Sequence, residues 1–522
     1  MKGVGAGEMM LPKAGWIAGL LIAASAVPMN AQDDGVTTLK VKTRIVILDV
    51  VVTDGKGRIF TDLKKDDFII REDKVEQQIR YFEPPSGHAM PVTEKPIVES
   101  SADLRKIGDA PVTILVLDEL NTRWEDMGYA KGQMEKYLKA QPEVLKQATT
   151  LLAANNTKFV QVHDYTQSRA SLLKALHDHF PDYPWRLMKS GKSGPGAVER
   201  MAQSLSSLQQ IAQAQTGTPG RKNVIWVGKG FPGADTSALD DVTEKTIEDV
   251  IHRTTNMLLA ARITLYTIDP TANTTTTVDV QDPDDIAAES NENGGDPFAG
   301  TVQFSQFATE TGGKIYYSRN DIDKVIAEGI EAGNNYYTLS YAPTDTTDDA
   351  AKYRKIRIIM KNPNLRAVTR DGYFPETKGA PNVVIAKGTP PKQAKAMLQM
   401  DLSDAVMSSM VYNGLRATAT KGAGNVWNVS VAPGTLEWSA GAGGAKQAEV
   451  SLLAACFSKS DKILAHTARE MTSASKADNP QMTGVDAVFS IAVDVPAGTT
   501  RLRFVVRDAV SGRMGTVDVA KP

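Results

Sequence analysis

The sequence contains very little cysteine. Cys456 is the only one among 522 residues, so an internal disulfide is excluded. It lies in an apolar, strand-like run at 450–457, a setting that favours a buried thiol over a reactive one. An excess of one charge is also missing, since 59 Lys and Arg residues balance 61 Asp and Glu residues. Without a basic excess, nucleic acid is not an expected partner.

Long apolar runs are also missing, apart from one near the N-terminus. Lys2 and Lys13 precede an apolar stretch at 14–27, and small residues before Gln32 offer a cleavage site. About fourteen apolar residues are too few to span a bilayer comfortably. Residues 1–31 are therefore predicted to be a secretory signal peptide, with an uncleaved anchor helix as the alternative. We expect an exported protein, periplasmic, cell-surface or secreted, with no transmembrane segment after signal removal.

Familiar catalytic motifs are absent as well. No Gly-x-Ser-x-Gly, His-Glu-x-x-His, Walker A or Gly-x-Gly-x-x-Gly segment occurs in a suitable context. His177 and His179 have the spacing of metal ligands, but no third ligand lies nearby in the sequence. A solvated helix end is the expected explanation for this pair. The sequence therefore favours a non-enzymatic protein.

A regular alternation of strand and helix patterns is present over residues 110–334. Apolar runs at 112–117, 223–227 and 263–268 predict buried strands, and apolar residues at helical spacing lie between them. A hairpin is predicted around Asn155-Asn156. Such an alternation is typical of a doubly wound α/β sheet.

Strand patterns flank this unit on both sides. Residues 38–84 and 335–375 each contain too few strands to bury a core alone. They are expected to form one discontinuous β-sandwich in which the α/β domain is inserted. Residues 376–399 predict a linker rich in Pro, Gly and Lys, and residues 400–522 predict a C-terminal β-sandwich. The expected fold class is multidomain, α/β plus all-β.

A series of segments within residues 40–375 is distinctive in both composition and order. They are LDELNT (117–122), HDYT (163–166), GRKNVIWVGKGFP (220–232), ITLYTIDP (263–270), TGGKIYYSRNDIDKVI (311–326), NYYTLSYAP (335–343) and TRDGYF (369–374). Together they resemble the VWFA-related proteins typical of acidobacteria. The resemblance implies a von Willebrand factor A-like domain over 110–334 in an exported protein. It implies no particular activity, because the biochemical role of the family is largely undefined.

The resemblance also implies a divalent-cation site, with Mg²⁺ or a similar ion at the carboxyl ends of the strands. Asp118 matches the first acidic ligand of the wider superfamily, and Thr122 keeps the second hydroxyl. Leu120 stands where the first Ser is expected and offers no ligand. The second-loop Thr would fall near Ser193, with Thr166 as a competitor.

The third loop departs furthest from the superfamily pattern. The expected Asp is replaced by Gly228-Lys229-Gly230, and Asp235 could substitute only if its loop folds back. Three arrangements follow: a degenerate metal site, a cap in which Asp118 and Thr122 bind loop backbone, or an ion pair between Lys229 and Asp118. No cofactor is certain, and a divalent cation remains one alternative.

The predicted function is protein binding through this end of the sheet. The predicted partner-binding face consists of Asn121, Trp124, Lys229, Phe231 and Asp235. Exposed Trp124 and Phe231 would suit an interface hot spot, with packing inside the loops as the alternative. A structural scaffold of the cell envelope is the second hypothesis, and a hydrolase of an envelope polymer is the third.

Overall fold

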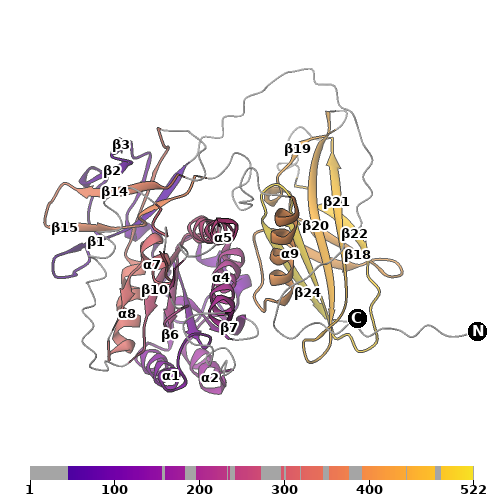
Figure 1. Cartoon of the computed structure of the whole chain (residues 1–522), viewed down its shortest axis with the longest axis horizontal. Helices are drawn as coiled ribbons and strands as arrows, with labels where there is room; N and C mark the ends of the chain where they lie inside the picture. The colour runs from indigo at the N-terminus through magenta and orange to yellow at the C-terminus, as the bar shows by residue number, and fades with distance from the viewer. Residues whose placement is uncertain are drawn as a thin grey trace, which may run out of the picture. The chain divides into compact units, whose positions relative to one another are not determined.

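The computed structural model describes most of the chain after the predicted signal peptide, which lies outside it. The described residues are 45–155, 159–182, 195–231, 233–235, 241–271, 296–298, 301–317, 319–344, 352–375, 391–441, 444–476 and 484–520. They form a mixed α/β structure with several sheets (Figure 1). Within these ranges, no helix has the length and apolar character needed to cross a membrane.

A six-stranded sheet of order β12-β10-β8-β5-β6-β7 carries the region of the predicted site. Five strands are parallel, and β7 closes one edge antiparallel to β6. The strands are β5 (Val112–Asp118), β6 (Val144–Ala154), β7 (Phe159–Ser168), β8 (Lys222–Val227), β10 (Ile263–Ile268) and β12 (Ile315–Tyr316). Every residue of β5, β8 and β10 is buried, because helices cover both faces of the sheet.

Alternate residues of β5 enter two separate cores. Ile114 and Val116 pack with helices α4 (Pro195–Gln215), α5 (Asp241–Ala260) and α7 (Gln306–Glu310). Leu115 and Leu117 pack with helices α1 (Trp124–Lys139), α2 (Arg169–Asp178) and α8 (Ile322–Asn334). The predicted buried strands and the hairpin between β6 and β7 are confirmed.

Two four-stranded sheets combine strands from both flanks of this unit. One has the order β15-β1-β13-β4 and the other β16-β14-β2-β3. The strands are β1 (Val46–Asp54), β2 (Phe68–Glu72), β3 (Val75–Gln77), β4 (Tyr81–Glu83), β13 (Tyr337–Tyr341), β14 (Arg354–Met360), β15 (Leu365–Val368) and β16 (Gly372–Tyr373). Leu48 and Tyr337 of one sheet share a core with Ile70 and Ile356 of the other.

The C-terminal residues form a three-stranded sheet and a five-stranded sheet around another core. The strands are β17 (Ala417–Lys421), β18 (Val426–Val431), β19 (Ser439–Ala440), β20 (Lys446–Phe457), β21 (Ile463–Ser475), β22 (Ala487–Ala492), β23 (Arg501–Asp508) and β24 (Met514–Ala520). Trp427 packs against Phe504 with ring centroids 5.3 Å apart. Cys456 is buried in the same core, as predicted.

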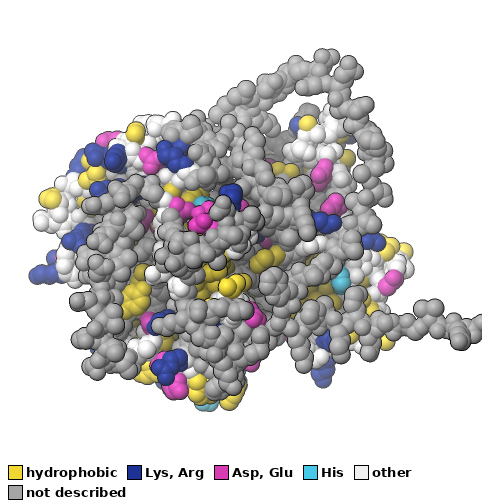
Figure 2. All heavy atoms as spheres, viewed as in Figure 1, with side chains coloured by type: hydrophobic (Ala, Val, Ile, Leu, Met, Phe, Trp, Pro, Cys, Tyr) yellow, Lys and Arg dark blue, Asp and Glu magenta, His cyan; other side chains and the backbone are white. Residues whose placement is uncertain are grey.

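Short elements connect these sheets. They are the 3-10 helices η1 (Lys65–Asp67), η2 (Pro85–His88), η3 (Ser101–Ile107) and η4 (Pro433–Thr435), and the paired strands β9 (Ala234–Asp235) and β11 (Thr301–Val302). Basic and acidic side chains are interspersed over the described surface visible in Figure 2.

Helix α9 (Pro391–Met407) was not predicted, because the sequence indicated a linker followed by strands at this position. Asp401 on α9 pairs with Arg253 of α5 and lies 3.4 Å from Arg507 Nη2 of β23. All three side chains are buried, with 5–6% of their surface exposed. Ion pairs therefore connect the helix to two distant parts of the chain.

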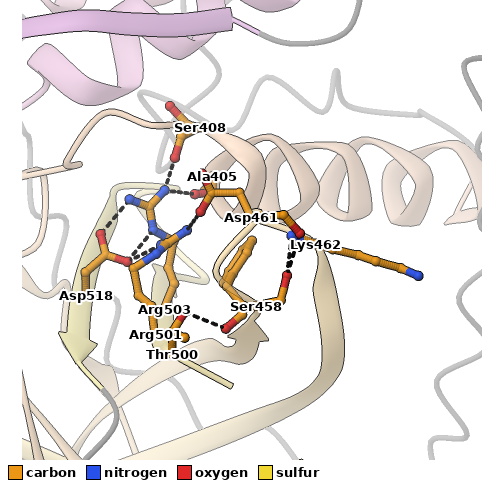
Figure 3. Close-up of polar contacts among 11 residues, drawn as sticks. Ala405, Ser408, Ser458, Asp461, Lys462, Thr500, Arg501, Arg503 and Asp518 are labelled. Atoms are coloured by element: carbon orange, nitrogen blue, oxygen red, sulfur yellow. Dashed lines mark hydrogen bonds and ion pairs between the residues drawn. The ribbon is translucent and has the colours of Figure 1, made fainter. Parts of the chain in front are cut away.

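The C-terminal end of α9 is held by Arg503 of β23 (Figure 3). The Arg503 guanidinium donates to the backbone oxygens of Ala405 and Ser408 and to the carboxylate of Asp518. Arg501 shares the Asp518 carboxylate and also bonds Asp461. These arginines therefore have acidic partners of their own.

Candidate functional site at the strand ends

Asp118 is the last residue of β5 and is completely buried at the carboxyl edge of the six-stranded sheet. Its Oδ2 accepts hydrogen bonds from Trp226 Nε1 at 3.0 Å and from the Gly230 amide at 2.9 Å. Its Oδ1 accepts from the amides of Leu120 at 3.1 Å and Asn121 at 2.9 Å. The Asn121 side-chain amide lies 3.3 Å from both oxygens.

These donors fill the acceptor capacity of the carboxylate, which has about four lone-pair sites. Burial raises the pKa of Asp118, while the hydrogen bonds from Trp226, Asn121 and Gly230 act in the opposite direction. The carboxyl group is thus stabilised by neutral N–H dipoles. It connects β5 to the loops that follow β5 and β8.

Gly228 brings the loop after β8 against Asp118. A Cβ atom on Gly228 would lie 2.1 Å from the Asp118 Cβ and 2.8 Å from Thr122 Oγ1. No side chain fits at this point, because the two loops are already in contact. The loop after β8 therefore presents backbone, and no carboxylate, to Asp118 at this point.

The other predicted ligands do not complete a cation site. Leu120 is fully buried, and Thr122 Oγ1 and Asn121 Oδ1 are buried without a hydrogen-bond partner among the described atoms. Two neutral oxygens beside a carboxylate already saturated by N–H donors are a poor donor set for Mg²⁺, which requires a nearly ideal octahedron of oxygens. The arrangement does not fit a resident divalent cation.

Of the predicted alternatives, the cap is partly right. Asp118 does bind the loop backbone, but Thr122 caps nothing, and α1 begins without a side-chain cap. The predicted pairing of Lys229 with Asp118 is wrong. The Lys229 amine instead lies 3.6 Å from the carboxylate of Asp269, and its side chain is 63% exposed.

A second buried acid next to Asp118 was overlooked in the sequence. Glu119 is fully buried, bonds the imidazole Nε2 of His179, and accepts from the Asp182 amide at 3.0 Å. The expected solvated helix end is therefore wrong for His179, while His177 is 78% exposed. An acidic residue directly after a buried strand was the signal that should have suggested a distant partner.

The predicted partner-binding face is only partly exposed. Trp124, in the first turn of α1, is 41% exposed, whereas Asn121 is 9% exposed. For Phe231 the predicted alternative of packing inside the loops is confirmed, because only 2% of its surface is accessible. Its ring packs edge-on against Phe304 at 5.6 Å, and Phe304 also contacts Trp226 at 4.7 Å.

The remaining predicted positions contribute little to this site. Ser193 and the side chain of Asp235 lie outside the described residues, although the Asp235 backbone pairs with Thr301. Thr166 lies opposite Thr149, back from the carboxyl edge of the sheet, and accepts from the Ser168 amide at 3.0 Å. In the described portion, no cluster of three or more His, Cys, Asp or Glu residues is arranged to hold a metal.

Comparisons with known proteins leave the family open. No family model matches the chain, and no curated protein matches it. One matching solved structure is "The crystal structure of endonuclease/exonuclease/phosphatase from Beutenbergia cavernae DSM 12333", with 10% identity and a TM-score of 0.12. The match covers 37% of this chain and 39% of that chain, so it spans less than half of that protein. A TM-score this low carries no information on fold or activity.

Proposed function

We propose that this protein is an exported, non-enzymatic binding protein that presents a strand-end face to a protein partner. The strand-end face is defined here by Trp124 and Lys229, whose side chains are exposed. The observation that carries the proposal is the saturation of Asp118 by five nitrogen donors, which holds the loops after β5 and β8 in one arrangement. A binding surface on loops gains affinity when its loops are ordered before binding.

The fold assignment belongs to the same proposal. We assign the six-stranded sheet and its helices to a von Willebrand A-like domain, inserted in a β-sandwich made by the two four-stranded sheets. The C-terminal sheets would form the second sandwich. The parallel strand order and the buried Asp at the end of β5 support this assignment.

Contact residues on this face follow from exposure and chemistry. Trp124 offers a large aromatic surface at the start of α1, and Lys229 extends from the loop after β8. An exposed aromatic residue and an exposed lysine suit a partner with an acidic and apolar patch. Because the donors to Asp118 are all protein N–H groups, this recognition does not require a bridging cation.

The scaffold alternative rests on β21. This strand of 13 residues pairs with β20 on one side, and no second ladder to it is present among the described residues. A long strand edge can accept a strand from another chain.

Immobilised protein should capture a partner from an envelope extract, and the double variant Trp124→Ala/Lys229→Ala should reduce that capture by about tenfold or more. The matched control is Lys56→Ala, which removes an exposed lysine from another part of the chain. A chelator should leave capture by the wild type unchanged. Capture that survives the double variant would contradict the proposal, and capture lost instead on Leu464→Pro within β21 would favour the scaffold.

A further inference from the structure

A cleft of about 720 Å³ lies at the opposite edge of the six-stranded sheet from Asp118. One wall is made by segments that lead into β5, β8 and β10, and the other by segments next to β17 and β24. The lining residues are Arg105, Thr216, Gly217, Pro219, Ala260, Asn413, Gly414, Arg416, Thr435 and Arg513. None of them belongs to the strand-end face, so this inference is independent of the proposed function.

The charge of this lining has one sign. Arg105, Arg416 and Arg513 contribute three guanidinium groups, and the lining contains no Asp or Glu. Arg513 lies 4.0 Å from the carboxylate of Glu437, at the limit of an ion pair. Within the described chain, the side chains of Arg105 and Arg416 have no hydrogen bond or ion pair.

Other arginines of the same region are neutralised by acidic residues. Arg501 and Arg503 share Asp518, as Figure 3 shows, and Arg253 pairs with Asp401. Arg105 and Arg416 of the cleft differ from these three arginines, because neither has an acidic partner among the described residues. Three cations gathered around a concave surface, with Glu437 as the one described carboxylate that pairs with any of them, indicate a place for an external anion.

The walls of the cleft are fixed by close backbone contact. A Cβ on Gly217, where φ is +82°, would lie 3.0 Å from the Asn413 oxygen. A Cβ on Gly414 would lie 2.9 Å from the Met514 oxygen, and the Leu415 amide bonds that same oxygen at 3.0 Å. The cleft is thus formed before any ligand arrives, which lowers the entropy cost of binding.

We propose that this cleft binds a small phosphorylated ligand with at least two negative charges, such as a diphosphate or bisphosphate. Guanidinium groups donate two parallel hydrogen bonds to phosphate oxygens, and several of them can share a multiply charged group. The volume matches that of sites for small organic ligands. The Asn413 side-chain amide also lines the cleft, whereas the hydroxyls of Thr216 and Thr435 donate to the backbone oxygens of Ala212 and Ala432.

Isothermal titration calorimetry of the whole protein with inorganic pyrophosphate tests this site. We expect saturable binding with one site per chain, weakened by about tenfold or more in Arg105→Gln/Arg416→Gln, because each lost charge-assisted bond is strong. Arg366→Gln, at another exposed arginine, is the matched control and should bind as the wild type does. Circular dichroism checks that the variants are folded.

Two results would overturn the proposal. One is the absence of saturable heat with pyrophosphate at low ionic strength. The other is equal weakening in Arg366→Gln and in the double variant, which would indicate nonspecific attraction of the anion. Neither result affects the strand-end face, because that face shares no residue with the cleft.

Discussion

Replacing Asp118 with Ala is expected to lower the free energy of unfolding by about 3–5 kcal/mol. The substitution removes the acceptor of Trp226 Nε1 and of the Gly230 amide, both of which are buried. Buried donors left without an acceptor keep their full desolvation cost, and the lost carboxyl group also leaves a small cavity. Urea unfolding followed by circular dichroism measures the loss.

The loss of stability in Asp118→Ala should depend on pH in a defined direction. Because burial raises the pKa of Asp118 above 3.8, its contribution to stability is fully present below that value and declines as the pH rises through the folded-state pKa. The difference in free energy of unfolding between the wild type and Asp118→Ala should therefore become smaller from acid to neutral pH. Asp62→Ala, at an exposed carboxylate, is the control and should change stability by about 0.5 kcal/mol or less. Equal stability of the two variants would contradict the account of the strand ends.

Asp401→Ala is expected to destabilise the protein by about 3–5 kcal/mol, because it leaves Arg253 and Arg507 buried without their shared carboxylate. The effect should appear in scanning calorimetry as a lower unfolding temperature. Helix α9 contacts both α4 and β23 and so connects the α/β unit to the C-terminal sheets. When Asp401→Ala loosens this helix, the C-terminal sheets should also unfold separately from the α/β unit.

Lys395→Ala provides the matched control, as it changes an exposed charge on the same helix. It should leave both the temperature and the shape of the transition unchanged. If Asp401→Ala changed the unfolding temperature no more than this control does, the ion pairs would not be what holds α9 in place.

The strands of the α/β unit were predictable because burial on both faces requires continuous apolar runs. The position of Asp118 followed from the same reasoning, since it ends such a run. Helix α9 was not predicted from the sequence, and its Asp401 is fixed by Arg253 and Arg507, which lie far away in the chain. Its identity as a helix depends on tertiary contacts more than on local pattern.

Several residues of the site could not be placed from the sequence for a related reason. The sequence left open whether Phe231 is exposed or packed, because its aromatic partner Phe304 is not revealed by the local sequence. His179 finds Glu119 after a similar separation in the chain. The glycines of the loop after β8 suggested a lost ligand, whereas their structural role is the close approach of backbone to Asp118. Loop residues at strand ends are placed by partners from other loops, so their exposure cannot be read from one segment.

Protein N–H groups occupy the carboxylate of Asp118, where a divalent cation was one of the predicted alternatives. Calorimetric titration of the purified protein with Mg²⁺ tests it most directly, with Thr122→Val as a variant that removes the second predicted ligand and conserves its shape. We expect no saturable heat for the wild type and none for Thr122→Val. Saturable binding of Mg²⁺ by the wild type that is lost in Thr122→Val would contradict this expectation and restore a metal site at the strand ends.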